Sequence, residues 1–190
     1  MIGARLPLAL ETGGLTVPTG RIAVFHPTPE ANLRSLPAEQ CEIIQPFRPA
    51  YETFKAAGYS CAVEPTERYA LSIICLPRAK AEARSIIAKA AAFTDGPIII
   101  DGQKTEGVDS IFKDLRKRGD VSATISKAHG KLFWVNSHDG LEDWAQTPTL
   151  TEGGFWTGPG VFSADGVDPA SELLAQALPE KLGKNVADLG

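Results

Sequence analysis

Short apolar runs alternate with helix-forming segments along most of this 190-residue chain. The runs are apolar at consecutive positions rather than at every second one, a pattern typical of strands that are buried on both faces. Pro or Gly bounds most of them and so separates them from their neighbours. A chain of this kind folds as a parallel sheet with helices on both sides. We therefore predict an α/β domain with a doubly wound, mostly parallel sheet over residues 20–137.

Pro and Gly residues and the spacing of apolar residues predict where each helix and strand begins and ends. A Pro at the first helical position and a Gly at the stop predict a helix over 49–57. The alanine-rich segment 79–93 repeats its apolar residues at spacings of three and four, which predicts a second helix with one buried face. A short helix is also predicted over 30–36. Further helices are expected at 108–118 and 168–178, and strands at 21–26, 42–45, 59–63, 70–76, 98–100, 121–125, 132–135 and 185–190.

The composition changes at the end of the first domain. Residues 1–19 form an N-terminal segment, and residues 138–152 contain a Thr/Pro cluster that reads as a linker. Residues 153–190 begin Gly-rich and aromatic and continue into a helix for which Asp168 is the expected cap. A single strand after that helix needs neighbours before it can be buried. We predict that 153–190 is the truncated start of a second domain; the alternative is a last strand added to the first sheet.

Charge and cysteine content exclude several classes of protein. The formal net charge of -4 excludes a uniformly basic nucleic-acid coat, although not a local basic face. No apolar stretch approaches the roughly 20 residues that span a bilayer, and no signal-peptide pattern is present at the N-terminus. The three cysteines are widely spaced and read as buried free thiols in a reducing cytoplasm. Neither the cysteines nor the three histidines have metal-ligand spacing, so we expect a cytoplasmic protein without metal.

Ligands of doubly wound sheets bind at the carboxyl ends of the strands, and a nucleotide-like ligand needs a glycine-rich first loop there. Here the first loop, residues 26–29, reads H-P-T-P. It contains no glycine, and its two prolines lack the backbone N–H groups that such a ligand requires. We therefore expect no cofactor site in the first domain.

Basic residues are concentrated in one segment. Residues 103–131 contain seven Lys/Arg and four Asp/Glu, a local charge of +3, which leaves -7 for the rest of the chain. This surplus predicts contacts with RNA phosphates, and the alternative is a solvated helix end, where cations are favoured. His129 is expected to be a turn residue, and Gln103 and Lys104 a structural turn or a ligand-binding loop. The candidate RNA-binding residues are Arg116, Lys117, Arg118, Lys127 and Lys131.

The end of the chain resembles a known family. Residues 157–163 read T-G-P-G-V-F-S, residues 165–168 read D-G-V-D, and 171–174 begin a Leu-rich helix. This order is similar to the segment that leads into the catalytic domain of the small-subunit ribosomal RNA guanine-N2 methyltransferases and their large-subunit relatives. In that family a class I methyltransferase fold follows, with a D-x-G-x-G loop that binds S-adenosyl-L-methionine. The resemblance implies cofactor contacts from Asp188, Gly190, Phe162 and Ser163; for Phe162, packing between the two halves is the alternative.

The resemblance extends to the first domain, because the family carries an N-terminal domain similar to a decayed, Rossmann-like copy of the methyltransferase fold. Residues 69–77 have the shape of the strand that normally ends in the catalytic N-P-P-F/Y motif, but 75–78 read C-L-P-R. The amide that would hold the target amino group is therefore missing, and the motif occurs nowhere in the 190 residues. The cofactor loop is also cut after its first glycine.

The resemblance thus implies the N-terminal region of an S-adenosylmethionine-dependent rRNA guanine-N2 methyltransferase. Its expected partners are ribosomal RNA and its own catalytic domain, and the region is expected to aid RNA binding and support that domain without catalysing methyl transfer by itself. Two alternatives stay open: a stand-alone module that binds RNA or protein, and a nucleotide-dependent oxidoreductase. The missing first-loop glycines count against the last of these.

Overall fold

The structure is a computed structural model that describes residues 2–12 and 14–187. The chain divides into two compact units, residues 1–146 and 147–190. The division falls within the stretch 138–152. Leu141 and Trp144 of that stretch are nevertheless buried in the core of the first unit.

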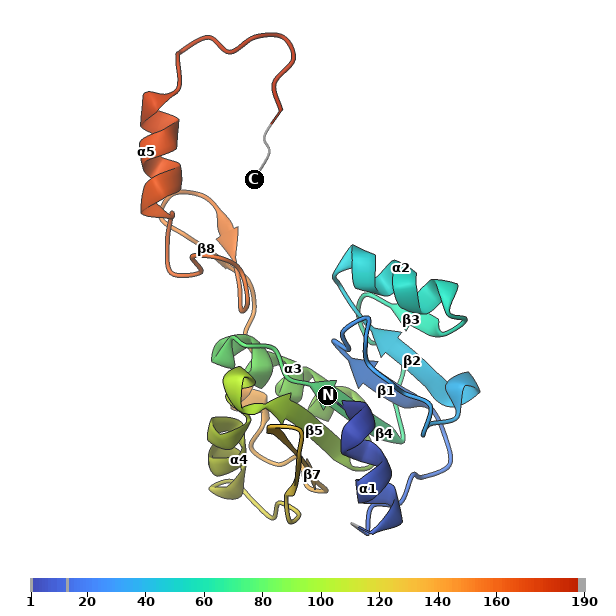
Figure 1. The fold of residues 1–190 in the computed structure, drawn as a ribbon. Helices are drawn as coiled ribbons and strands as arrows, with labels where there is room; N and C mark the ends of the chain where they lie inside the picture. The colour runs from blue at the N-terminus through green and yellow to red at the C-terminus, as the bar shows by residue number, and fades with distance from the viewer. Residues whose placement is uncertain (1, 13, 188–190) are drawn as a thin grey trace. The chain divides into compact units, whose positions relative to one another are not determined.

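The described part of the first unit contains a seven-stranded sheet in the order β3-β2-β1-β4-β5-β7-β6 (Figure 1). The first five strands of this order run parallel, and β7 is antiparallel to both of its neighbours. The order reverses between β1 and β4, which makes their carboxyl ends the switch point where ligands of such sheets bind. The predicted doubly wound, mostly parallel fold is confirmed. The strands are β1 (Ile22–Phe25), β2 (Cys41–Ile44), β3 (Ser60–Ala62), β4 (Leu71–Cys75), β5 (Ile98–Gln103), β6 (Ile125–Lys127) and β7 (Gly130–Val135).

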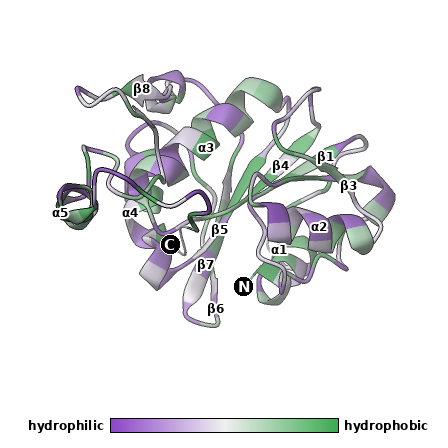
Figure 2. Ribbon diagram, turned by 90° about the horizontal axis from the view of Figure 1, so that it is seen from above, coloured by the Kyte–Doolittle hydropathy of each residue, from purple (hydrophilic) through white to green (hydrophobic). Residues whose placement is uncertain are grey.

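Helices cover both faces of the sheet, and successive residues of a strand belong to different cores. Ile22 and Val24 pack with the N-terminal helix and α2, whereas Ala23 and Phe25 pack with α3 and α4. The central strands β1 and β4 are accordingly mostly hydrophobic, while the helices carry hydrophilic segments (Figure 2). The helices are η1 (Ile2–Ala4), α1 (Leu6–Glu11), η2 (Ala38–Gln40), α2 (Arg48–Ala56), α3 (Lys80–Phe93), η3 (Lys104–Glu106), α4 (Val108–Arg116) and η4 (Glu142–Trp144).

The helix predicted over 30–36 is wrong. This stretch forms turns, in which the Arg34 N–H donates to the Asn32 side-chain oxygen at 3.1 Å and the Ala31 N–H donates to the Thr28 carbonyl at 2.8 Å. Asn side chains compete with the helical hydrogen-bond pattern in this way, so local sequence favours the turn.

Two predicted strands also differ from the structure. Over 121–125 only Ile125 belongs to a strand, because Val121 makes just an isolated bridge to Val135 and Ser122 is bonded through its hydroxyl to the Trp134 N–H. Of the strand expected over 185–190, residues 185–187 are not in a strand. The remaining three residues lie outside the described part of the chain.

The second unit contains a small hairpin and one helix. The hairpin pairs β8 (Thr149–Leu150) with β9 (Trp156–Thr157), and the helix is α5 (Pro169–Ala177), close to its predicted bounds. As predicted, Asp168 caps this helix, since its carboxylate accepts from the Ser171 N–H at 3.0 Å. No residue of α5 is buried. Among the described residues of either unit, no helix has the length and apolarity needed to cross a membrane.

Candidate functional site

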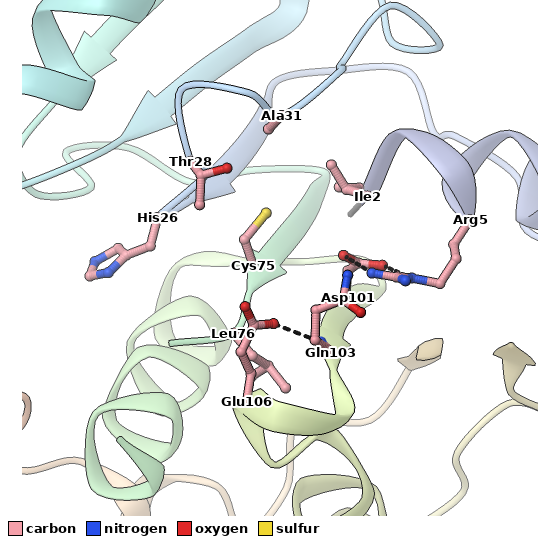
Figure 3. A pocket seen from close by; sticks show the side chains of 10 residues that line it. All are labelled: Ile2, Arg5, His26, Thr28, Ala31, Cys75, Leu76, Asp101, Gln103 and Glu106. Atoms are coloured by element: carbon pink, nitrogen blue, oxygen red, sulfur yellow. Dashed lines mark hydrogen bonds and ion pairs between the residues drawn. The ribbon is translucent and has the colours of Figure 1, made fainter. Parts of the chain in front are cut away.

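The carboxyl ends of β1, β4 and β5 surround a small cavity of about 80 Å³ (Figure 3). Its position matches the switch point of the sheet, where the fold would place a ligand. Ile2 of η1 and Arg5, which precedes α1, close it from one side. The lining residues are Ile2, Arg5, His26, Thr28, Ala31, Cys75, Leu76, Asp101, Gln103 and Glu106.

A buried ion pair fills the β5 side of this cavity. Arg5, which directly precedes α1, is fully buried, and Asp101 of β5 is 4% exposed. The Arg5 Nε donates to Asp101 Oδ1 at 2.6 Å and its Nη2 donates to Oδ2 at 2.8 Å, while Nη1 donates to the Lys127 carbonyl at 2.8 Å. The charges of the Arg5 guanidinium and the Asp101 carboxylate therefore compensate each other in a bidentate geometry, as a buried ion pair requires.

Two glycines make room for this arrangement. A Cβ on Gly130 would collide with the Arg5 guanidinium and would lie 2.5 Å from the Gly102 carbonyl oxygen. A Cβ on Gly102 would lie 2.8 Å from the Leu76 side chain. The close approach of β5, β7 and the arginine thus depends on the absence of side chains at both positions.

The loop after β1 begins with a residue in the left-handed region, because His26 has a φ of 52°. Gln45 holds this loop: its side-chain Nε2 donates to the Pro27 carbonyl at 3.0 Å. Burial lowers the pKa of His26 to about 4, assisted by the positive charge of Lys89 and partly opposed by the negative charge of Glu64. The ring, which points away from Cys75 and Arg5 in Figure 3, is therefore neutral near pH 7.

The end of β4 offers no reactive group. Desolvation raises the pKa of the Cys75 thiol far above its usual range, with the negative charges of Asp101 and Glu106 acting in the same direction. The thiol is therefore protonated at neutral pH and is a poor nucleophile. Leu76, which follows it, is buried against Gly102. A protonated thiol and a buried leucine thus stand at the end of β4, and the correspondence of this segment to the family motif stays a prediction.

The size and chemistry of the cavity do not fit a nucleotide-like cofactor. Pockets for such molecules typically have a volume of about 300–1,000 Å³. This one has about 80 Å³, and its charged groups already bind one another. The Glu106 carboxylate likewise accepts from the Gln103 N–H at 2.6 Å. Among the described residues, no group of three or more His, Cys, Asp or Glu side chains could hold a metal ion.

The five candidate RNA-binding residues differ in their contacts, although Arg116 and Lys131 both lie over the Phe112 ring, at 5.6 and 5.8 Å from its centroid. Arg118 makes a bidentate ion pair with Asp143, at 2.8 and 2.9 Å, and stacks on the Trp144 ring. Lys131 pairs with Asp109 at 2.6 Å. These two cations are therefore engaged within the fold. Arg116 and Lys117 lie exposed at the end of α4, and Lys127 lies exposed on β6.

Sequence reasoning did not group Lys104 with Lys127. The Lys104 N–H donates to the His129 carbonyl at 3.0 Å, which brings the end of β5 beside the turn between β6 and β7. The pairing of Gln103 with Gly130 in the antiparallel ladder creates this contact, and no local spacing in the sequence reports it.

The predicted cofactor residues belong to the second unit. Phe162 is 81% exposed, and Ser163 has a φ of 52° with its hydroxyl donating to the Gly166 carbonyl at 2.8 Å. Both line an open apolar hollow together with Trp156 and residues of α5. Asp188 and Gly190 lie outside the described residues. The four cofactor contacts stay a prediction.

Comparison with known proteins identifies relatives of both units. The model of the family described as "Methyltransferase small domain" matches residues 152–190. The chain is 29% identical over 169 residues to the ribosomal RNA small subunit methyltransferase C of Vibrio parahaemolyticus, covering 79% of this chain and 49% of that protein. It is 31% identical over 135 residues to the protein of the same name from Psychromonas ingrahamii, covering 65% of this chain and 39% of that protein. The chain thus spans about half the length, or less, of these curated relatives.

Solved structures show the same fold. The 16S rRNA N2 methyltransferase of T. thermophilus, solved in complex with AdoMet and guanosine, aligns with a TM-score of 0.66 at 23% identity. The alignment covers 85% of this chain and 49% of that protein. A second structure, from Thermoplasma acidophilum, aligns with a TM-score of 0.53 at 19% identity, over 72% of this chain and 88% of that one.

Proposed function

We propose that this chain forms the N-terminal region of an rRNA guanine-N2 methyltransferase. The proposal follows from its membership of the family of the small-subunit ribosomal RNA methyltransferases. Its first unit is a non-catalytic α/β domain that aids RNA binding and supports the catalytic domain. Residues 153–190 begin that catalytic domain. The methyl donor of the complete enzyme is S-adenosyl-L-methionine.

One observation carries the non-catalytic role of the first unit: the buried pair of Arg5 and Asp101 occupies the carboxyl edge of its sheet. A doubly wound domain that binds a nucleotide-like cofactor needs open space and unpaired polar groups at this edge. Here an N-terminal segment supplies a cation that neutralises the acidic residue of β5. The remaining cavity is too small for the cofactor.

The second unit supports the other half of the proposal, because large apolar side chains lie on its surface. Leu173 and Leu174 of α5 are 66% and 63% exposed, and Phe162 is 81% exposed. An amphipathic helix normally buries its apolar side chains against a neighbouring element. Since the matched family domain begins at residue 152, we infer that the rest of a catalytic domain covers these side chains in a longer protein.

The cofactor site is proposed for the same catalytic domain. Asp188 and Gly190 would form the start of its glycine-rich loop, and Phe162 and Ser163 would lie beside the cofactor. S-adenosylmethionine supplies the methyl group when bound. The residues of the first unit take no part in this transfer, and their contribution is to position RNA.

Calorimetric titration of S-adenosylhomocysteine tests the proposal. We expect no binding heat with the 190-residue chain and micromolar binding with a longer protein that continues past Gly190. Micromolar binding by the 190-residue chain would overturn the proposal, because a cofactor site would then lie within it. A matched variant, Phe162→Ala in the longer protein, is expected to weaken binding, whereas Phe47→Ala, which removes another exposed ring in the first unit, is expected to leave it unchanged.

A further inference from the structure

The turn between β6 and β7 has two non-glycine residues in the left-handed region, which alanine in particular disfavours. Ala128 and His129 have φ values of 50° and 57°, the signature of a type I′ turn. Such turns favour Asn and Gly at these positions, since other side chains clash with the backbone when φ is positive. Strain of this kind persists only where the surroundings impose it, and it is concentrated at functional sites.

Two contacts hold the turn from opposite sides. The Arg5 guanidinium donates to the Lys127 carbonyl at 2.8 Å, and the Lys104 N–H donates to the His129 carbonyl at 3.0 Å. The turn is therefore tied both to the buried ion pair and to the end of β5. These two hydrogen bonds from outside the turn oppose its movement.

The side chains at this tip are basic and exposed. Lys104, Lys127 and His129 are all exposed, and their backbones are neighbours. Within residues 2–12 and 14–187, neither Lys104 nor Lys127 forms an ion pair with a carboxylate, unlike Lys131 and Arg118. Part of the positive charge of the segment 103–131 that no carboxylate neutralises thus lies around the tip of this hairpin.

We propose that Lys104, Lys127 and His129 form a phosphate-binding site for RNA, which we term the hairpin tip. The proposal rests on the proposed function for its ligand, RNA, and adds the place of contact. Lysine ammonium groups bind phosphates as point charges, and a backbone that hydrogen bonds already hold loses less conformational entropy on binding than an unattached loop does. The exposed pair Arg116 and Lys117 needs no such role, because cations at the end of a helix are favoured by its dipole.

Fluorescence anisotropy with a labelled RNA stem-loop tests the hairpin tip in the 190-residue chain. The test variant is Lys104→Ala with Lys127→Ala, and the matched control is Lys181→Ala with Lys184→Ala, two exposed cations of the second unit. Each double variant removes two exposed cations, so both change the net charge equally. We expect the test variant to bind roughly tenfold more weakly, and its logarithmic salt dependence to flatten by about 1.4–1.8, the range for two lost phosphate contacts in a loop or a stem. The control is expected to change affinity by less than about threefold.

Several outcomes would overturn the inference. Equal losses in the two double variants would indicate diffuse attraction instead of a site, and unchanged binding by the test variant would exclude the tip. In both cases the wild-type chain still binds RNA, so the proposed function survives. A wild-type chain that fails to bind the stem-loop at low salt would overturn the tip together with the RNA-binding part of the proposed function. The titration with S-adenosylhomocysteine would then test the other part of the proposed function, the location of the cofactor site, separately.

Discussion

Arg5 and Asp101 lie 96 residues apart in sequence, yet their side chains meet through two parallel hydrogen bonds of 2.6 and 2.8 Å. Neither side chain is more than 5% exposed. This pair joins the N-terminal segment to the end of β5 and fills the edge where the fold would otherwise place a ligand. Its energetics are therefore the first property to test.

Removing one partner is expected to destabilise the protein strongly. Asp101→Asn or Arg5→Met leaves a buried charge without compensation, which typically lowers the free energy of unfolding by about 3–5 kcal/mol. The double variant Arg5→Met with Asp101→Leu leaves no charge and should lose less than the two single variants combined. Urea unfolding measures all three. Arg68→Met, which breaks an exposed pair with Asp95, is the control and should cost less than about 1 kcal/mol; a similarly small loss in Asp101→Asn would contradict the structure.

A methyl group at Gly130 is expected to disturb the same pair. The new Cβ would meet both the Arg5 guanidinium and the Gly102 carbonyl, so Gly130→Ala should lower the free energy of unfolding by about 1–3 kcal/mol. Gly119→Ala is the matched control, because a methyl group added there would meet no heavy atom within 4 Å and the φ of Gly119 is not positive. Thermal unfolding separates the two variants. Equal melting temperatures would show that the packing around Gly130 is looser than the structure indicates.

Acid is expected to destabilise the fold through His26. The pKa of His26 is about 4 in the folded protein, and its ordinary value is 6.5. Between pH 4 and pH 6.5 the unfolded chain therefore binds a proton at His26 more readily than the folded protein does. The free energy of unfolding therefore falls as the pH drops from about 6.5 towards 4, by at most about 1.4 kcal/mol per pH unit, and His26 contributes no change above that range. The raised pKa of Glu82 acts in the opposite direction, because its buried carboxyl takes up a proton more readily when folded.

His26→Asn is the variant that isolates this effect, since Asn tolerates a positive φ and does not titrate. Urea titrations at a series of pH values should show a flatter acid limb for the variant than for the wild type. Identical slopes would mean that another group controls the acid response.

Relieving the strain of the β6–β7 turn is expected to stabilise the protein. Ala128→Asn places a residue that favours type I′ turns where alanine costs about 1–2 kcal/mol, so the free energy of unfolding should rise by up to about 1 kcal/mol. Chemical denaturation measures the gain. Ala123→Asn, at an exposed position where no positive φ occurs, serves as the comparison and should give no gain. A destabilised Ala128→Asn variant would argue against the left-handed conformation.

Proteases are expected to cut the second unit first. Its helix buries no residue and its two strands have two residues each, so little burial opposes local opening there. Limited chymotrypsin digestion with mass spectrometry should show early cuts after exposed aromatic residues such as Phe155, Trp156 and Phe162, and a stable fragment that ends beyond residue 146. Early cleavage within α3 or α4, whose inner faces are buried, would contradict the division of the chain into these two units.

Local patterns predicted most of the sheet, because apolar runs indicate buried strands and apolar spacings of three and four indicate helices. The strand at Ile98 and the helix with Ile86 and Ile87 follow from apolar runs and spacings that no tertiary contact needs to correct. The helix over 30–36 failed for a local reason as well, since the Asn32 side chain stabilises a turn in competition with the helix.

The candidate site was far less predictable. Nothing near Arg5 in the sequence indicates a buried cation, because its partner lies across the sheet and α1 has only six residues. The contact between Lys104 and His129 likewise depends on strand pairing between β5 and β7. Long-range pairing of this kind creates both the closed edge and the hairpin tip, and single-sequence patterns do not encode it.

The closure of the sheet edge by Arg5 has a consequence for how such a domain can change over generations. A substitution that removes Arg5 leaves the charge of Asp101 buried without a partner. A substitution that removes Asp101 leaves the charge of Arg5 in the same position. No substitution at Gly130 can enlarge the space beside Arg5 either, since glycine is already the smallest residue. Reopening the edge would require several simultaneous changes, each harmful alone. Arg5 and Asp101 are therefore expected to be gained or lost together.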